Sequence, residues 1–402
     1  MKTGYLQRYI TASNWLQASG AMALGAMLVT LAIGTPSAKA QTYTVLHSFN
    51  GTDGQYPMAG LIRDEAGNLY GTTEYGGAQG YGVVFRLDKT GETVVYSFTG
   101  GTDGRYPVAG LTRDSTGNLY GTTQVGGASD LGIVFMVDTT GAETVLHSFT
   151  GGTDGAFPWA GLIQNPAGHL YGTAESGGSP NAGVVFKLDT TGTETVLHTF
   201  RGADGDGPYA GLTGDSAGNF YGTTAYGGTV DKGVVFKLDK AGETVLHSFT
   251  DSPDGAYPYS GVIPDPAGNL YGTTVNGGLN GGAQGYGAAF MVDTTGTEKV
   301  LYSFSGGADG AFPHAGLIRD PAGNLYGTTA YGGVYGYGVV FKLDATGMET
   351  VLYSFTGGTD GANPVAGLIA DSEGNLYGTT VEGGSGNGVV FKLHLDGLIG
   401  IF

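Results

Sequence analysis

From residue 43 onward, short apolar runs alternate with turn residues, and none of these runs has the length or period of a helix. In one stretch the runs are 109–113, 118–123, 132–137 and 143–149, rich in β-branched and aromatic residues, as strands are. Asp-x-x-Gly segments join the first run to the second and the third to the fourth, which predicts two tight hairpins. The pattern therefore predicts a four-stranded antiparallel meander.

This meander is repeated. The hexapeptide Asn-Leu-Tyr-Gly-Thr-Thr at 68–73 returns, unchanged or nearly so, at 118–123, 169–174, 219–224, 269–274, 324–329 and 375–380. The Phe that ends the fourth run recurs at intervals of 49 to 55 residues, giving seven units of about fifty residues. Seven four-stranded units predict an all-β fold, a seven-bladed β-propeller, rather than an open solenoid, which needs polar capping units.

The ends of the repeat region are complementary. Residues 43–49 form a lone fourth strand, and residues 388–393 form a third strand that lacks its usual partner. We expect these two strands to pair, complete the seventh blade and close the ring. Residues 395–402 form a short tail that could compete for the same edge, and the sequence favours closure by the N-terminal strand.

Residues 1–40 differ from the repeats in composition. Lys2 and Arg8 precede an apolar run at 21–33 and an Ala-Lys-Ala segment at 38–40, the order of a secretory signal peptide. We expect cleavage after Ala40 and one seven-repeat domain at 41–402, secreted or at the cell surface, with no membrane span. A retained anchor is the alternative, although the run is shorter than the ~20 residues of a spanning helix. The chain has no cysteine, so it forms no disulfides.

Three segments of the unit resemble a known family. They are Asp-Gly-x-[Tyr/Phe]-Pro-x-[Ala/Ser]-Gly-[Leu/Val], the hexapeptide followed by Gly-Gly, and Gly-Val-Val-Phe-Lys-Leu-Asp-x-x-Gly-x-Glu-x-Val-Leu. Over residues 43–394 the chain resembles the Gloeo/Verruco (GloVer) tandem repeat family of exported bacterial proteins. The resemblance implies a surface or extracellular location and no established activity.

The formal net charge of −18 narrows the choice of partners. More than half of the 35 acidic residues are Asp of the hairpins or of the Asp-Gly segments, so the turns account for most of the charge. No basic stripe is present, and we expect no nucleic-acid partner. Each Asp-Gly loop supplies too few carboxylates to bind calcium, so we expect its Asp to cap the turn. Only one such loop has two carboxylates, Asp204 and Asp206, and these two residues are metal candidates. No cofactor is expected.

Catalytic residues are not assigned. Four of the seven histidines share one position of the fourth strand with tyrosines, which indicates packing rather than acid–base chemistry: His47, His147, His198 and His247 alternate with Tyr96, Tyr302 and Tyr353. Nucleophile and phosphate-binding motifs are absent. Glu74, Glu175 and Glu382 lie in variable loops, so an extracellular enzyme acting on carbohydrate remains an alternative.

Differences between the copies point to binding. The loops after the second and fourth strands, which share one face, carry most of the variation. The aromatic residue before the repeated proline recurs, and we expect it to pack between blades. The residue after this proline varies: Met58, Val108, Trp159, Tyr209, Tyr259, His314 and Val365.

Flat aromatic faces with polar edges suit sugar rings or an extended peptide. We therefore expect a monomeric binding module for a neutral or cationic extracellular glycan or protein ligand. Its predicted site comprises Trp159, Tyr209, Tyr259, His314, Met58, Tyr75, Tyr226 and Tyr331. A purely structural surface protein is a further alternative.

Overall fold

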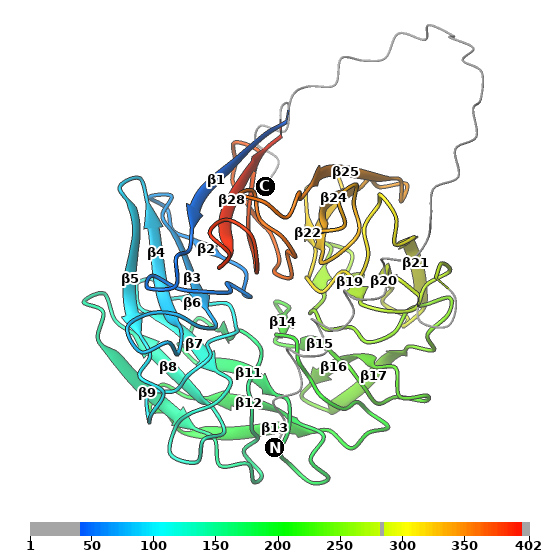
Figure 1. The fold of residues 1–402 in the computed structure, drawn as a ribbon. Coiled ribbons are helices and arrows are strands. Elements are labelled where there is room, and N and C mark those ends of the chain that lie inside the picture. The colour runs from blue at the N-terminus through cyan, green and yellow to red at the C-terminus, as the bar shows by residue number, and fades with distance from the viewer. Residues whose placement is uncertain (1–40, 282–284, 396–402) are drawn as a thin grey trace, which may run out of the picture. The chain divides into compact units, whose positions relative to one another are not determined.

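The computed structural model describes residues 41–281 and 285–395, which belong to one compact unit. The predicted signal peptide lies outside the described residues, as do residues 396–402 of the tail. Seven four-stranded antiparallel sheets are arranged in a ring, so the predicted seven-bladed propeller is confirmed (Figure 1). The fourth strand of each blade lies at the periphery of the ring.

Six blades consist of four consecutive strands each. In chain order they are β2 (Ile62–Arg63), β3 (Leu69–Thr73), β4 (Val83–Asp88) and β5 (Gly91–Ser97) in blade 1; β6 (Thr112–Arg113), β7 (Leu119–Thr123), β8 (Ile133–Val137) and β9 (Glu143–Ser148) in blade 2; β10 (Ile163–Gln164), β11 (Leu170–Ala174), β12 (Val184–Leu188) and β13 (Glu194–Thr199) in blade 3; β14 (Thr213–Gly214), β15 (Phe220–Thr224), β16 (Val234–Asp239) and β17 (Gly242–Ser248) in blade 4; β18 (Ile263–Pro264), β19 (Leu270–Thr274), β20 (Ala288–Val292) and β21 (Glu298–Ser303) in blade 5; and β22 (Ile318–Arg319), β23 (Leu325–Thr329), β24 (Val339–Leu343) and β25 (Glu349–Ser354) in blade 6.

Blade 7 is assembled from both ends of the repeat region. It combines β26 (Ile369–Ala370), β27 (Asn375–Thr380) and β28 (Val389–His394) with β1 (Thr42–Ser48), and Figure 1 shows β1 beside β28. The two strands are antiparallel, with Tyr43 opposite Leu393. The Tyr43 ring stacks on Tyr353 of blade 6 with centroids 4.0 Å apart. Closure by the N-terminal strand, as expected, is confirmed.

The innermost strands are shorter than the sequence pattern suggests. Residues 109–113 form a strand only at Thr112–Arg113, because the preceding residues make contacts between blades instead. The Ala109 carbonyl accepts a hydrogen bond from the Thr72 hydroxyl of blade 1 at 2.9 Å. The equivalent bond recurs between all neighbouring blades, including Thr379 to Ala59 across the closure.

The repeated hexapeptide is explained by contacts at each of its positions. In blade 1, Leu69 is buried, and the Asn68 amide and the Tyr70 hydroxyl donate to Asp64 of the hairpin at 2.8 and 3.1 Å. Thr72 makes the bond between blades, and the Thr73 hydroxyl donates to the Tyr75 carbonyl at 2.8 Å. Gly71 faces the Phe85 ring so closely that an added Cβ would lie 2.6 Å from Cζ. Every residue type is therefore required by the scaffold, which is why the segment hardly varies.

The turn aspartates act as predicted. Asp64 Oδ1 accepts the Asn68 backbone N–H at 2.8 Å in the first hairpin of blade 1, and Asp138 Oδ1 accepts that of Thr140 at 2.8 Å in the second hairpin of blade 2. These charge-assisted bonds satisfy backbone donors in the turns. The abundance of Asp thus follows from the fold.

Candidate functional site

The segment that enters each blade is held by a repeated backbone contact. In blade 2 the residue before the proline, Tyr106, donates its N–H to the Tyr81 carbonyl of blade 1 and accepts from the Gln124 N–H of its own blade, both at 3.0 Å. Its φ is 59°, and all seven pre-proline residues share this left-handed conformation. A bulky side chain is rarely found there. The two hydrogen bonds offset the energetic cost of this backbone conformation. They also fix the position of the residue that follows the proline.

Seven glycines, each two residues after a post-proline residue, meet around the axis and are called the glycine ring here: Gly60, Gly110, Gly161, Gly211, Gly261, Gly316 and Gly367. A Cβ added to Gly161 would lie 2.9 Å from the Gly110 carbonyl oxygen, and one on Gly261 would lie 2.8 Å from that of Gly211. Backbones this close bring the seven post-proline side chains together at one end of the channel, called the mouth.

Four of these side chains form a continuous aromatic arc across blades 3 to 6. Ring centroids are 5.9 Å apart for Trp159 and Tyr209, 5.3 Å for Tyr209 and Tyr259, and 6.0 Å for Tyr259 and His314. All four residues are half-buried. The aromatic arc is thus a continuous surface of tilted rings on one side of the mouth.

A carboxylate orients the first two rings of the aromatic arc. Glu175 follows β11 and accepts hydrogen bonds from Trp159 Nε1 and from the Tyr209 hydroxyl, each at 2.7 Å. The two donors come from adjacent blades and use different carboxylate oxygens. Charge-assisted bonds of this length are strong and directional. Glu175 therefore fixes the rings that would contact a ligand.

The opposite side of the mouth has a similar carboxylate in a different environment. Glu74 follows β3 at the position that Glu175 has after β11, and only 3% of it is exposed. The post-proline residues of blades 1 and 2 are Met58 and Val108, which offer no donor. Glu74 Oε2 has no hydrogen-bond partner among the described residues. Burial raises the pKa of Glu74 to about 7, a change that its hydrogen bond with Tyr75 opposes.

The other predicted ligand-binding residues divide into two groups. Tyr226 lies against the aromatic arc, with its ring 6.3 Å from that of Tyr209 and its hydroxyl 3.1 Å from that of Tyr259. Tyr75 and Tyr331 instead lie against pre-proline aromatics, Tyr75 with its ring 4.9 Å from that of Tyr106 and Tyr331 6.0 Å from Phe312.

Burial lowers the pKa of His314 at the end of the aromatic arc to about 4, so its imidazole is neutral at physiological pH. His314 therefore contributes a neutral ring to the mouth, as the tyrosines do.

The two metal candidates do not form one group. Asp204 comes within reach of His198 and Glu243, and the ligand atoms of these three residues lie within 4.8 Å of one another. Asp206 is outside this group, and burial followed by the charge of Asp231 raises its pKa. The sequence did not indicate His198 or Glu243 as neighbours of Asp204, because they come from different blades.

From the sequence, Glu175 is a candidate only for the alternative of a carbohydrate-active enzyme, and the predicted binding site does not include it. Its position directly after a second strand could have indicated its place at the mouth, since Tyr75 and Tyr226 lie one residue further along their own copies. Its two partners could not be inferred, because one of them lies 34 residues away on the next blade.

Comparison with known proteins identifies the family. A family model described as the Gloeobacter/Verrucomicrobia repeat matches residues 34–165 and 214–399. The chain belongs to this family. The expectation from the repeated segments is thereby confirmed, and the matched residues include most of the seven Gloeobacter/Verrucomicrobia repeats. A search of curated protein sequences found no match.

Several solved structures are similar to this repeat protein in fold. The extracellular domain of a candidate one component system from B. thetaiotaomicron has a TM-score of 0.58 at 12% identity, with 87% of this chain and 39% of that chain covered. The extracellular domain of a candidate hybrid two component system from the same organism has a TM-score of 0.55 at 12% identity, with 89% of this chain and 42% of that chain covered. A candidate 6-phosphogluconolactonase from Bacteroides uniformis has a TM-score of 0.51 at 19% identity, with 77% of this chain and 88% of that chain covered.

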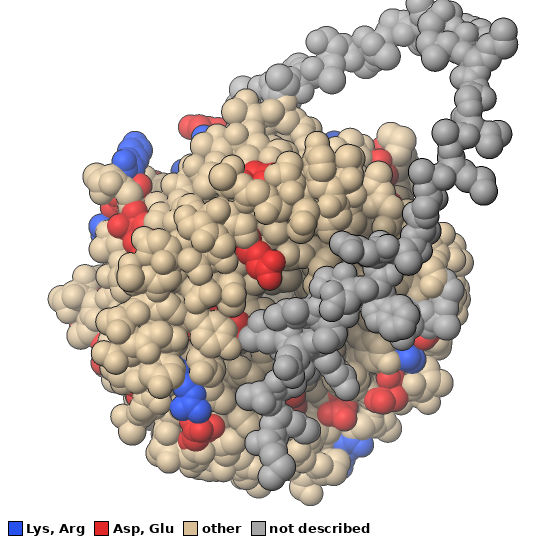
Figure 2. Space-filling model, in the orientation of Figure 1, with Lys and Arg blue, Asp and Glu red and all other residues tan. Residues whose placement is uncertain are grey.

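The chain thus spans about two-fifths of the length of the two B. thetaiotaomicron domains. At these identities the likeness concerns the fold alone. Within the described part of the Gloeobacter/Verrucomicrobia repeat protein, no helix is both long and apolar enough to cross a membrane. On the face shown in Figure 2, charged side chains lie in separate small groups among uncharged residues.

Proposed function

We propose that this protein is an extracellular, non-catalytic binding module that holds a neutral polysaccharide at the mouth of its propeller. The observation that carries the proposal is the aromatic arc, in which Trp159, Tyr209, Tyr259 and His314 present neighbouring rings from four blades. Sugar rings pack their apolar faces on such surfaces, and tyrosine hydroxyls at the edge can bond sugar hydroxyls.

The charge state of the aromatic arc favours a neutral ligand over an ionic one. Both oxygens of Glu175 already accept hydrogen bonds from the aromatic arc, and His314 is neutral at physiological pH. A neutral ligand would lose little solvation energy on contact with this surface, whereas an ionic ligand would need a compensating charge. A single neutral chain could lie along several rings at once.

The loops around the mouth offer further contact surface. Six large hydrophobic residues are exposed in loops that join the second strand of a blade to its third: Tyr81, Val230, Leu279, Val334, Tyr335 and Tyr337. Val334 is 72% exposed and Tyr335 is 58% exposed. Apolar side chains at loop tips are typical of surfaces that contact a partner. The face that carries the mouth therefore supports a ligand larger than one sugar.

The location outside the cell is part of the proposal. It is supported by the leader-like composition of residues 1–40.

A glycan array followed by calorimetry tests this function. The triple variant Trp159→Ala, Tyr209→Ala and Tyr259→Ala should lose at least about tenfold in affinity for any glycan that the wild-type chain binds, because it removes three stacking surfaces. The matched control is the double variant Val108→Ala and Val365→Ala, which changes the other side of the same mouth and should keep the affinity within about twofold.

Melting curves of both variants show whether the fold survives the substitutions. Equal affinities of the aromatic triple variant and the wild type, with both folded, would refute the proposal. Equal losses of affinity in the aromatic triple variant and in the control variant would also refute it, because the effect would then not belong to the aromatic arc.

A further inference from the structure

Two of the seven connections between blades are one residue shorter than the others. The Phe that ends the fourth strand is followed by the Asp of the Asp-Gly segment after four residues in Phe49 to Asp53 and Phe200 to Asp204. In the other five copies the separation is five residues, as in Phe98 to Asp103. These two short connections lie between blades 7 and 1 and between blades 3 and 4.

The missing residue changes the surroundings of the Asp. In the five longer connections the residue after the Phe is Thr or Ser, and its hydroxyl donates to the Asp, as Thr99 does to Asp103 at 2.6 Å. In the two short connections Asn50 and Arg201 take this place. Among the described residues, Asp53 and Asp204 accept no hydroxyl hydrogen bond, and each accepts the backbone N–H of that residue. Part of each carboxylate is thus available to another ligand.

A histidine lies next to each of these two Asp residues. His47 Nε2 is 3.2 Å from Asp53 Oδ2, and His198 Nε2 is 3.2 Å from Asp204 Oδ2. The neutral imidazole of histidine is a common metal ligand.

A glutamate from the following blade completes each group. The ligand atoms of His47, Asp53 and Glu92 lie within 4.8 Å of one another, as do those of His198, Asp204 and Glu243. Among the described residues, Oε1 of Glu92 and of Glu243 is buried without a hydrogen-bond partner, as is the equivalent oxygen of Glu143, Glu194, Glu298 and Glu349. The longer connections with histidine, at His147 and His247, do not form such a group. Among the described residues, the two short connections therefore differ from the longer ones in the freer Asp and in the close approach of the three ligand atoms.

We propose that each of these two groups binds one divalent transition-metal ion of the Zn²⁺ type through one imidazole nitrogen and two carboxylate oxygens. Zn²⁺ accepts this mixed ligand set, and water can complete its coordination. Calcium is disfavoured because it requires six to eight oxygen ligands. An ion at either site would join two neighbouring blades, because His47 and Glu92 belong to blades 7 and 1, and His198 and Glu243 to blades 3 and 4. The proposal is independent of the glycan site.

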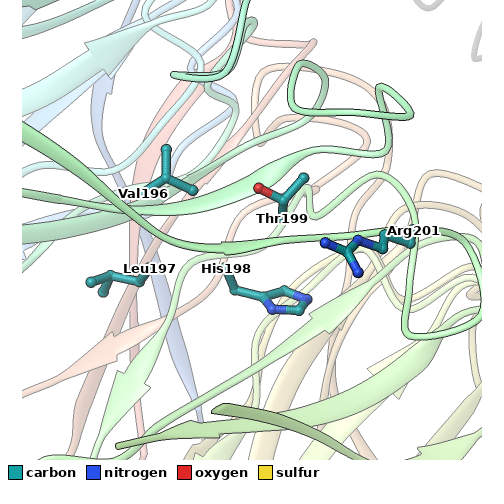
Figure 3. Close-up of a pocket in the computed structure, with 5 residues that line it drawn as sticks. All are labelled: Val196, Leu197, His198, Thr199 and Arg201. Atoms are coloured by element: carbon teal, nitrogen blue, oxygen red, sulfur yellow. The ribbon is translucent and has the colours of Figure 1, made fainter.

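The second site carries a competing charge beside a surface hollow. His198 and Arg201 line a surface hollow of about 320 Å³ together with Val196, Leu197 and Thr199 (Figure 3). The Arg201 guanidinium is close enough to influence His198 electrostatically, and it would repel a cation. Asn50 occupies the equivalent place at the first site. The first site should therefore bind the metal more tightly than the second.

Zinc titration of the untagged full chain, after removal of metals with a chelator, tests the proposal. Equilibrium dialysis at pH 7.5 should give two equivalents of Zn²⁺ per chain. The double variant His47→Tyr and His198→Tyr should bind none, while His147→Tyr and His247→Tyr should still bind two. Tyr already occupies this strand position at Tyr96, Tyr302 and Tyr353, so both variants should fold.

Further variants distinguish the two sites and guard against misfolding. Glu92→Gln and Glu243→Gln should each remove one equivalent, and Arg201→Asn should tighten the weaker site several-fold. No uptake by the wild type, or equal loss in the two double histidine variants, would overturn the proposal.

Discussion

The two sides of the propeller mouth stand on the same backbone but carry different chemistry. On the side of blades 3 to 6, Glu175 is hydrogen-bonded to Trp159 and Tyr209, and the rings of the aromatic arc follow one another. On the side of blades 1 and 2, Glu74 is buried, and the post-proline residues Met58 and Val108 offer it no donor. One carboxylate position thus serves as an anchor for aromatic rings in one blade and holds a proton near neutral pH in another. Chemistry at the mouth depends on the post-proline residues and not on the fold.

The largest expected effect comes from removing the element that closes the ring and so holds the two sides together. Deletion of residues 41–50 removes β1, exposes the edge of β28 and leaves the stacking face of Tyr353 without its partner. We expect aggregation, or a fall in melting temperature of more than about 10 °C, which corresponds to a loss of several kcal/mol in a chain of this size. Calorimetry and light scattering would measure it. Unchanged melting would show that β1 is not required for closure.

A smaller effect is expected from the buried carboxylate of blade 1. The pKa of Glu74, about 7 in the folded protein, lies above its ordinary value of 4.5, so folding favours the protonated form. The associated stabilisation is complete below about pH 4.5 and is lost as the pH rises through about 7. The wild type should therefore lose about 3 kcal/mol of unfolding free energy between pH 4.5 and pH 9 from this group.

Glu74→Gln should lack this loss and be more stable than the wild type at pH 9. Denaturant unfolding at a series of pH values measures the difference, with the exposed Glu65→Gln as control. Parallel pH profiles for wild type and Glu74→Gln would contradict the contrast between Glu74 and Glu175.

The smallest effect is expected on the other side of the mouth. Trp159→Phe keeps an aromatic ring but removes the Nε1 donor to Glu175. The half-buried carboxylate then loses one of its two charge-assisted bonds, which should cost about 1–2 kcal/mol of unfolding free energy. In a Glu175→Ala background the same substitution should cost much less, and denaturant unfolding of the four proteins gives the coupling. Equal costs in both backgrounds would mean that the bond contributes little.

Most of the fold was accessible from the sequence because its determinants are local and repeated. The hairpin Asp, the strand pattern and the two complementary ends predicted the meander, the number of blades and the closure by β1. The innermost strands were predicted too long, since the bonds from Thr72 and its equivalents to the next blade are invisible in a single repeat.

The site was accessible only in part for the same reason. The post-proline pattern identified the rings of the aromatic arc. It could not show that Glu175 accepts hydrogen bonds from Trp159 in its own blade and from Tyr209 in the next, because these contacts depend on how neighbouring blades pack. The group of His198, Asp204 and Glu243 was missed although the shorter connection is visible in the sequence, because His and Tyr alternate at this position and the alternation suggested packing alone.

The glycine ring has a consequence for how recognition can change in such proteins. Its members carry no side chains and nearly touch, and each blade contributes one variable post-proline residue to the mouth, two residues before its glycine. A substitution there exchanges one functional group and leaves loop lengths and neighbouring backbones as they are. The seven post-proline positions lie on one rigid frame, so many combinations of side chains can be presented at the mouth. New ligand preferences can then arise by substitution of single residues, without insertions or remodelled loops.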